Sequence, residues 1–197
     1  MSRIDSRALL ALATALRETG YRFTTVTPAT HSRVVRRRER AGSVADVFGW
    51  NLPFELTVLP EPLATLGKAA SIFTPEGELL RSQVRFSTIR EELYVHSSFP
   101  TTAADAVFLG PDTHRFVAYV SRHLPPCRRL VDVGCGTGAG GLSARERTRE
   151  LILTDVNPQA VELARVNAAL QDAEPSFRVG EMLSGVAGPV EAIICNP

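Results

Sequence analysis

Apolar residues follow a helical spacing through the first part of the chain. Leucines and alanines three or four positions apart predict a helix over residues 6–18, and Gly20 ends it. A second helix is expected over residues 31–40, a stretch that is rich in arginine. Prolines divide residues 44–72 into short helices, because a proline disrupts the helical hydrogen bonds around it.

The period of the pattern changes in the next segment. Apolar side chains alternate with polar ones over residues 84–88 and again over 93–96, with a polar turn at 90–92. This alternation predicts a β-hairpin. Helices followed by a hairpin are compatible with a winged-helix-like module. Residues 1–100 are therefore expected to form a small α+β module with a role in substrate recognition.

Strands and helices alternate in the second half of the chain. A linker leads into a helix over residues 112–124, whose first turn Asp112 or Thr113 can cap. Strands are then expected at residues 130–133, 151–154, 177–179 and 190–195, and helices at 142–149 and 157–170. This order predicts an α/β fold in which residues 101–197 form a Rossmann-like parallel sheet.

The first predicted strand of this sheet runs into a glycine-rich loop. Asp132 is followed by Gly134, Gly136 and Gly138. Glycines allow the backbone to turn sharply and to approach a ligand closely, and the next helix presents free N–H groups. Asp155 ends the second predicted strand, where a carboxylate can accept hydrogen bonds from both hydroxyls of a ribose. The motif therefore indicates a nucleoside-containing cofactor.

Two cofactors remain compatible with the glycine loop. Gly136, Gly138 and Gly141 also satisfy the G-x-G-x-x-G spacing of dinucleotide sites, with Asp155 near the position expected of its acid. Asp132 favours S-adenosylmethionine, because a carboxylate suits the ammonium of a methionine moiety and repels a pyrophosphate. An NAD(P)-dependent oxidoreductase is the alternative.

Four segments carry a family resemblance. They are VDVGCGTGAGG, LILTDVNPQAVELARVNAAL, VGEMLSG and IICNP. With them, residues 107–197 resemble class I S-adenosylmethionine-dependent methyltransferases of the small methyltransferase group. That group includes ribosomal RNA guanine-N2 methyltransferases and release-factor glutamine methyltransferases. The resemblance implies a Rossmann-like fold and S-adenosyl-L-methionine as cofactor.

The resemblance also implies roles for individual residues. Gly134, Gly136 and Gly138 would line the methionine end of the cofactor, Asp132 would hold its amino group, and Asp155 would hold the ribose. Near the adenine it would place Val156, Glu181 and Met182. Pro111–Thr113 resemble a segment that closes over the cofactor. Glu181 departs from the family's usual Asp, and Val190–Glu191 stand where a Phe-Asp pair is usual.

Asn196 and Pro197 resemble the start of the family's Asn-Pro-Pro-aromatic motif, which implies a catalytic role. Exocyclic base amines and glutamine amides donate their lone pair into a π system, so they are poor nucleophiles. An Asn side-chain oxygen and a nearby backbone carbonyl can accept hydrogen bonds from the amine and favour a pyramidal nitrogen. Proline fixes the backbone so that the Asn196 carbonyl faces the site.

Composition narrows the range of functions. The chain has 197 residues and a formal net charge of +1. No apolar stretch is long enough to span a membrane, and charged residues interrupt any signal-peptide pattern near the N-terminus. The three cysteines share no metal-ligand spacing, so no metal site is expected. Free thiols indicate a cytoplasmic protein.

Charge is distributed unevenly. Residues 1–100 hold thirteen Lys and Arg against ten acids, whereas residues 101–197 hold nine against eleven. In the predicted helix over 31–40, one face would carry Arg33, Arg36, Arg37 and Arg40. Such a face either contacts RNA phosphates or is simply solvated.

The sequence reaches the catalytic motif at its last residues. A complete fold of this family would continue with about three more strands. The sheet is therefore expected to be incomplete at its C-terminus and the chain to be a fragment. The function predicted is methyl transfer to a planar nitrogen, either a nucleobase amine in RNA or DNA or a protein glutamine amide. A non-catalytic nucleic-acid-binding module with a relict cofactor fold is a further alternative.

Overall fold

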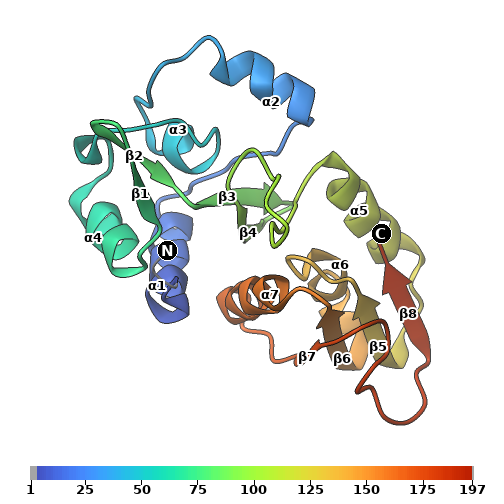
Figure 1. Cartoon of the computed structure of the whole chain (residues 1–197). Coiled ribbons are helices and arrows are strands. Elements are labelled where there is room, and N and C mark those ends of the chain that lie inside the picture. The colour runs from blue at the N-terminus through green and yellow to red at the C-terminus, as the bar shows by residue number, and fades with distance from the viewer. Residues whose placement is uncertain (1–3, 197) are drawn as a thin grey trace. The chain divides into compact units, whose positions relative to one another are not determined.

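The structure is a computed structural model in which residues 4–196 are described. The chain divides into two compact units, Met1–Thr102 and Ala103–Pro197 (Figure 1). Each unit has its own buried apolar residues. Among residues 4–196, no helix combines the length and the hydropathy needed to cross a membrane.

The N-terminal unit combines short helices with two antiparallel hairpins. Its elements are α1 (Ser6–Glu18), α2 (Pro28–Val35), α3 (Val44–Phe48), η1 (Leu56–Val58), α4 (Glu61–Ala69), β1 (Phe73–Glu76), β2 (Leu79–Ser82), β3 (Val84–Ile89) and β4 (Glu92–Ser97). The predicted first helix is confirmed, and it begins where the Asp5 carboxylate accepts a hydrogen bond from the Ala8 N–H at 2.8 Å. The predicted β3–β4 hairpin is confirmed as well, whereas the β1–β2 hairpin was not predicted.

The second helix differs from its prediction. It begins after Thr27 and ends at Val35, so the predicted extension to residue 40 is wrong. In the segment that follows the helix, Arg40 forms an ion pair with Glu55 at 2.9 Å. The predicted face that included Arg40 is therefore interrupted at the helix end.

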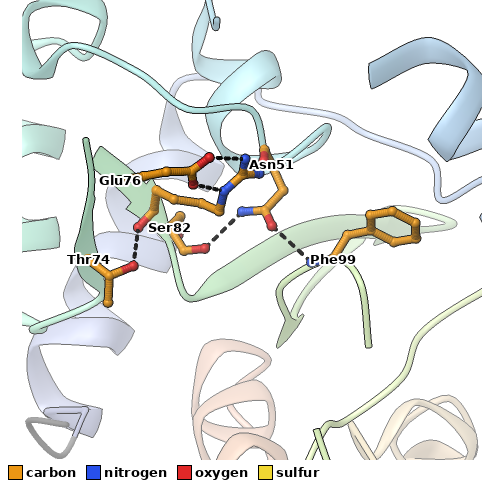
Figure 2. A network of polar contacts seen from close by, with 6 residues as sticks. Asn51, Thr74, Glu76, Ser82 and Phe99 are labelled. Carbon is orange, nitrogen blue, oxygen red and sulfur yellow. Dashed lines mark hydrogen bonds and ion pairs between the residues drawn. The ribbon is translucent and has the colours of Figure 1, made fainter. Parts of the chain in front are cut away.

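A buried asparagine ties the hairpins of this unit to its last segment. Asn51 donates from its side-chain amide to the Ser82 carbonyl at 2.8 Å and accepts from the Phe99 N–H at 2.9 Å (Figure 2). The Asn51 carbonyl accepts from Arg81, whose guanidinium also binds Glu76. Asn51 is 1% exposed and has a φ of 58°, a left-handed conformation that asparagine tolerates better than most residues. The side chain thus satisfies backbone groups that the strands leave open.

The C-terminal unit is built around a four-stranded parallel sheet with the order β7-β6-β5-β8 (Figure 1). Its elements are α5 (Pro111–His123), β5 (Cys127–Val133), α6 (Ala139–Leu142), η2 (Arg145–Arg147), β6 (Thr148–Asp155), α7 (Pro158–Leu170), β7 (Ser176–Val179) and β8 (Ala192–Cys195). The predicted α/β fold with a parallel sheet is confirmed. This strand order is that of a doubly wound nucleotide-binding fold, with its switch point between β5 and β8.

Two local predictions in this unit are wrong. The helix expected at 142–149 is instead the short α6 and η2, because residues from Thr148 onward join β6 and pair with β5. The N-cap of α5 is Gly110 rather than Asp112 or Thr113. Thr113 instead reaches back, and its hydroxyl accepts the Gly110 N–H at 3.3 Å. The predicted cap of α7 is confirmed, since the Asn157 side chain accepts the Gln159 N–H at 2.9 Å.

Candidate functional site

The glycine loop lies at the carboxyl edge of the sheet, directly after β5. Gly134, Gly136 and Gly138 have φ values of 66°, 53° and 79°, which side chains rarely adopt. A Cβ added at Gly134 or Gly136 would meet no atom within 4 Å. The loop backbone is therefore open at these positions, so that a ligand can approach the peptide groups closely.

Asp132 is buried beneath this loop. Its side chain is 2% exposed, and its Oδ2 accepts a hydrogen bond from the Gly141 N–H at 2.7 Å. Burial raises the pKa of Asp132 to about 7; the Gly141 hydrogen bond opposes this shift, and the charge of Asp155 adds to it. A cation placed beside Asp132 would stabilise the carboxylate.

Asp155 joins the two loops at the ends of β5 and β6. Its Oδ2 accepts the Gly136 N–H at 2.9 Å, and its Oδ1 accepts the Asn157 N–H, also at 2.9 Å. A carboxylate has about four lone-pair sites, so Asp155 can still accept from two further donors. The loops and the acid are thereby held in a fixed arrangement.

A cavity of about 430 Å³ opens at this edge of the sheet. Its lining includes the predicted residues Asp132, Gly134, Gly136, Asp155 and Asn196. Other lining residues were not predicted as site residues; they are Ala106, Val107, Phe108, Phe116, Cys135, Thr137, Ala139, Gly140, Asn157 and Ala160. Such a volume suits a small-molecule ligand, and the position matches the switch-point crevice of doubly wound sheets.

Four other predicted residues are not part of the cavity lining. Gly138 forms the N-cap of α6. Val156, Glu181 and Met182 follow β6 and β7, and the first and last of these are 65% and 63% exposed. Their backbone is linked to the sheet, since the Thr154 hydroxyl donates to the Met182 carbonyl at 3.3 Å. The predicted adenine contacts of these residues remain predictions, and Pro197 lies outside the described residues.

Asn196 follows β8 and lies across the switch point from the glycine loop. Its amide nitrogen donates to Asp112 Oδ2 at 3.4 Å. This contact uses the nitrogen and leaves the amide oxygen as an acceptor for a donor in the cavity. Asp112 lies in the first turn of α5, so this helix supplies the hydrogen-bond partner of the Asn196 amide.

The site collects the groups that a nucleoside bearing an amino-acid chain requires. It offers a buried carboxylate, an open glycine backbone and a strand-end aspartate, all around one cavity. Together with the strand order β7-β6-β5-β8, these features place a candidate small-molecule site at the switch point of a Rossmann-like fold. Residues 113–197 match the family described as the methyltransferase small domain.

Several curated proteins match part of the chain. The release factor glutamine methyltransferase of Deinococcus radiodurans is 45% identical over 71 residues, which cover 35% of this chain and 26% of the relative. The ribosomal RNA large subunit methyltransferase G of Streptomyces coelicolor is 40% identical over 84 residues, which cover 39% of this chain and 22% of the relative. The matched segment thus spans about a quarter of the length of these relatives.

Solved structures that superpose on this chain include the Thermus thermophilus 16S rRNA N2 G1207 methyltransferase in complex with AdoMet and guanosine. Its TM-score is 0.47 at 14% identity, and the superposition covers 74% of this chain and 46% of that one.

Proposed function

We propose that this chain carries the S-adenosylmethionine site of a methyltransferase that acts on RNA or protein. The observation that carries the proposal is the convergence of Asp132, Asp155 and Asn196 on one cavity at the switch point of the sheet. Asp132 would bind the ammonium of the methionine moiety, and Gly134 and Gly136 would approach its chain. Asp155 would accept from the ribose hydroxyls.

The exposed apolar side chains after β6 and β7 support an adenine position. Val156 and Met182 are both large and exposed, although burial is the usual state of such residues. An adenine ring between them would cover both, and Glu181 would accept from the adenine amine. A dinucleotide fits less well, because its pyrophosphate would lie near the buried Asp132 carboxylate.

The proposed reaction is methyl transfer to a planar nitrogen. S-adenosylmethionine, when bound, supplies a methyl group that is already activated as part of a sulfonium. The amide oxygen of Asn196 would accept a hydrogen bond from the target amine and help to localise the nitrogen lone pair. Asp112 would hold the Asn196 amide in the required orientation through the 3.4 Å contact. Pro197 would restrict the backbone beside it. Alignment of the amine with the methyl group would supply much of the remaining acceleration.

The acceptor is proposed to be a nucleobase amine in RNA or a glutamine amide in protein. Both are planar nitrogens, so the same Asn196 chemistry serves either one. The names of the relatives support this range, since one is a release factor glutamine methyltransferase and another a ribosomal RNA methyltransferase.

Calorimetric titration of the full chain with S-adenosylhomocysteine tests the cofactor site. We expect wild-type binding and a loss of at least about tenfold for Asp155→Ala, because two charge-assisted hydrogen bonds to the ribose disappear. Glu174→Ala is the matched control, because Glu174 is an exposed acid of the same unit and does not line the cavity. Unchanged affinity in Asp155→Ala would remove Asp155 from the site. Binding of NADH in place of S-adenosylhomocysteine would favour the oxidoreductase alternative.

A further inference from the structure

A second cavity lies in the N-terminal unit, outside the proposed cofactor site. It has a volume of about 470 Å³ and is lined by Ala29, Ser32, Arg33, Arg36 and Arg37. We name this surface the arginine groove. Three of its five lining residues are arginines, and none of the lining residues is acidic.

The groove follows from the helical spacing of α2 (Figure 1). Residues 29, 32, 33 and 36 stand at i, i+3, i+4 and i+7, so they share one face of the chain. His31 anchors α2 through another face. Its Nε2 lies 2.9 Å from the Trp50 carbonyl, and its ring centroid lies 4.1 Å from that of Phe99. The helix is therefore fixed to the unit by His31 while small side chains and arginines form the groove.

The arginines of this segment differ in their partners. Arg38 pairs with Asp46, and Arg40 pairs with Glu55 at 2.9 Å. Within residues 4–196, Arg33, Arg36 and Arg37 form no ion pair and are all exposed. Glu39 lies in the same segment but does not line the groove. The neighbouring acids thus pair with Arg38 and Arg40 and leave the three charges of the groove uncompensated.

We propose that the arginine groove binds the phosphodiester backbone of RNA. Guanidinium groups match phosphate oxygens in a bidentate geometry, and the Ser32 hydroxyl adds a further donor of the kind that contacts phosphates. The small side chains of Ala29 and Ser32 leave room for the backbone between the arginines. Because the three arginines lie within five consecutive residues at the end of α2, they can converge on one or two consecutive phosphates. This role rests on the proposed function, in which RNA is one acceptor class.

Salt-dependent RNA binding tests the groove. The full chain is titrated against a fluorescently labelled single-stranded RNA of mixed sequence, and anisotropy is measured between about 50 and 200 mM salt. We expect the triple variant Arg33→Gln, Arg36→Gln, Arg37→Gln to bind more weakly, with the slope of log K against log salt reduced in magnitude by about 2. The matched control is Arg7→Gln, Arg38→Gln, Arg40→Gln, which removes the same charge from the same unit. Circular dichroism confirms that both variants fold.

Each outcome decides the proposal. A loss in the groove variant with near wild-type binding in the control supports it. Equal losses in the two variants overturn it, because net charge alone then explains binding. Polyglutamate that displaces the RNA at equal charge concentration also overturns it, in favour of an acidic protein partner. S-adenosylhomocysteine affinity is measured on the same samples, so failure of the groove is distinguished from failure of the cofactor site.

Discussion

Asp132 is a buried carboxylate whose protonation is linked to the ligand that we propose for it. Burial raises the pKa of Asp132 to about 7. An ammonium beside the carboxylate would lower this pKa again, so binding near neutral pH would release a proton. Affinity for S-adenosylhomocysteine is therefore expected to rise with pH up to about 7 and to fall by up to tenfold for each pH unit below it.

Calorimetry in buffers of different ionisation enthalpy measures the released proton directly. The control is Asp132→Asn, which keeps the size of the side chain but has no carboxylate to titrate. This variant is expected to bind more weakly at alkaline pH and to lose the pH dependence. A wild-type pH profile in Asp132→Asn would show that another group titrates on binding.

The sequence predicted those residues of the candidate site whose own side-chain chemistry suggests a role. Asp132 and Asp155 lie at the ends of β5 and β6, Asn196 follows β8, and all three line the cavity. Phe116 and Ala160 line it too, but their positions depend on how α5 and α7 pack against the loops. An apolar residue on a helix carries no sequence signal that separates a cavity wall from a core.

Close packing at the start of α6 leaves little room for a side chain at Gly140. A Cβ at Gly140 would lie 2.5 Å from Phe116 Cε1 and 3.0 Å from Asp132 Oδ2. Gly140→Ala is therefore expected to lower the free energy of unfolding by about 1–3 kcal/mol. Because Phe116 and Asp132 both line the cavity, the affinity for S-adenosylhomocysteine is also expected to fall.

Denaturant unfolding and calorimetry measure these two effects. Gly42→Ala is the matched control, since a Cβ there would meet only Asp46 Oδ2 at 4.0 Å. The control is expected to keep both the stability and the affinity of the wild type. A stable Gly140→Ala variant with unchanged affinity would mean that Phe116 moves freely and does not shape the site.

Helices and strands were predicted well where their signals are local. The Asn157-Pro158 start of α7 and the alternation of β3 and β4 belong to this group. The helix expected at 142–149 failed because Thr148 and Glu150 extend β6, and their pairing with β5 depends on a distant partner. The β1–β2 hairpin was missed although its pairing is local, because Pro75 lies within β1 and a proline inside a short run argues against a strand. Its register is held by contacts such as the Thr74 hydroxyl with the Arg81 carbonyl at 3.2 Å.

The two units bury different kinds of ionisable residue, an acid in one and basic residues in the other. The C-terminal unit buries the acid Asp132, whereas the N-terminal unit buries Arg85, His31 and His96. The Arg85 Nε donates to the Gly49 carbonyl at 2.9 Å, and His96 Nε2 lies 2.7 Å from the Ser87 hydroxyl. Burial lowers the pKa of both histidines, and the charge of Arg85 lowers it further; the pKa of His31 falls to about 4.

Acid is therefore expected to destabilise the N-terminal unit. The folded pKa of His31 is about 4 against an ordinary value of 6.5, so the unfolded chain binds more protons between these values. The stability that the neutral histidine provides is complete above pH 6.5 and is lost as the pH falls toward 4. Thermal unfolding followed by circular dichroism should show a Tm that drops by at least about 4 °C across this window.

Replacing one histidine separates its contribution to the acid-induced fall in Tm from the contributions of the other titratable groups. In His96→Gln, an amide that does not titrate takes the place of a buried ring, and the Tm is expected to be lower at neutral pH but to change less on acidification. His123→Gln serves as the control, because His123 lies on α5, outside the unit that contains Arg85. The control should keep the full acid sensitivity of the wild type. If His96→Gln is as acid-sensitive as the wild type, His31 or the carboxylates of the chain must be the groups whose protonation unfolds it.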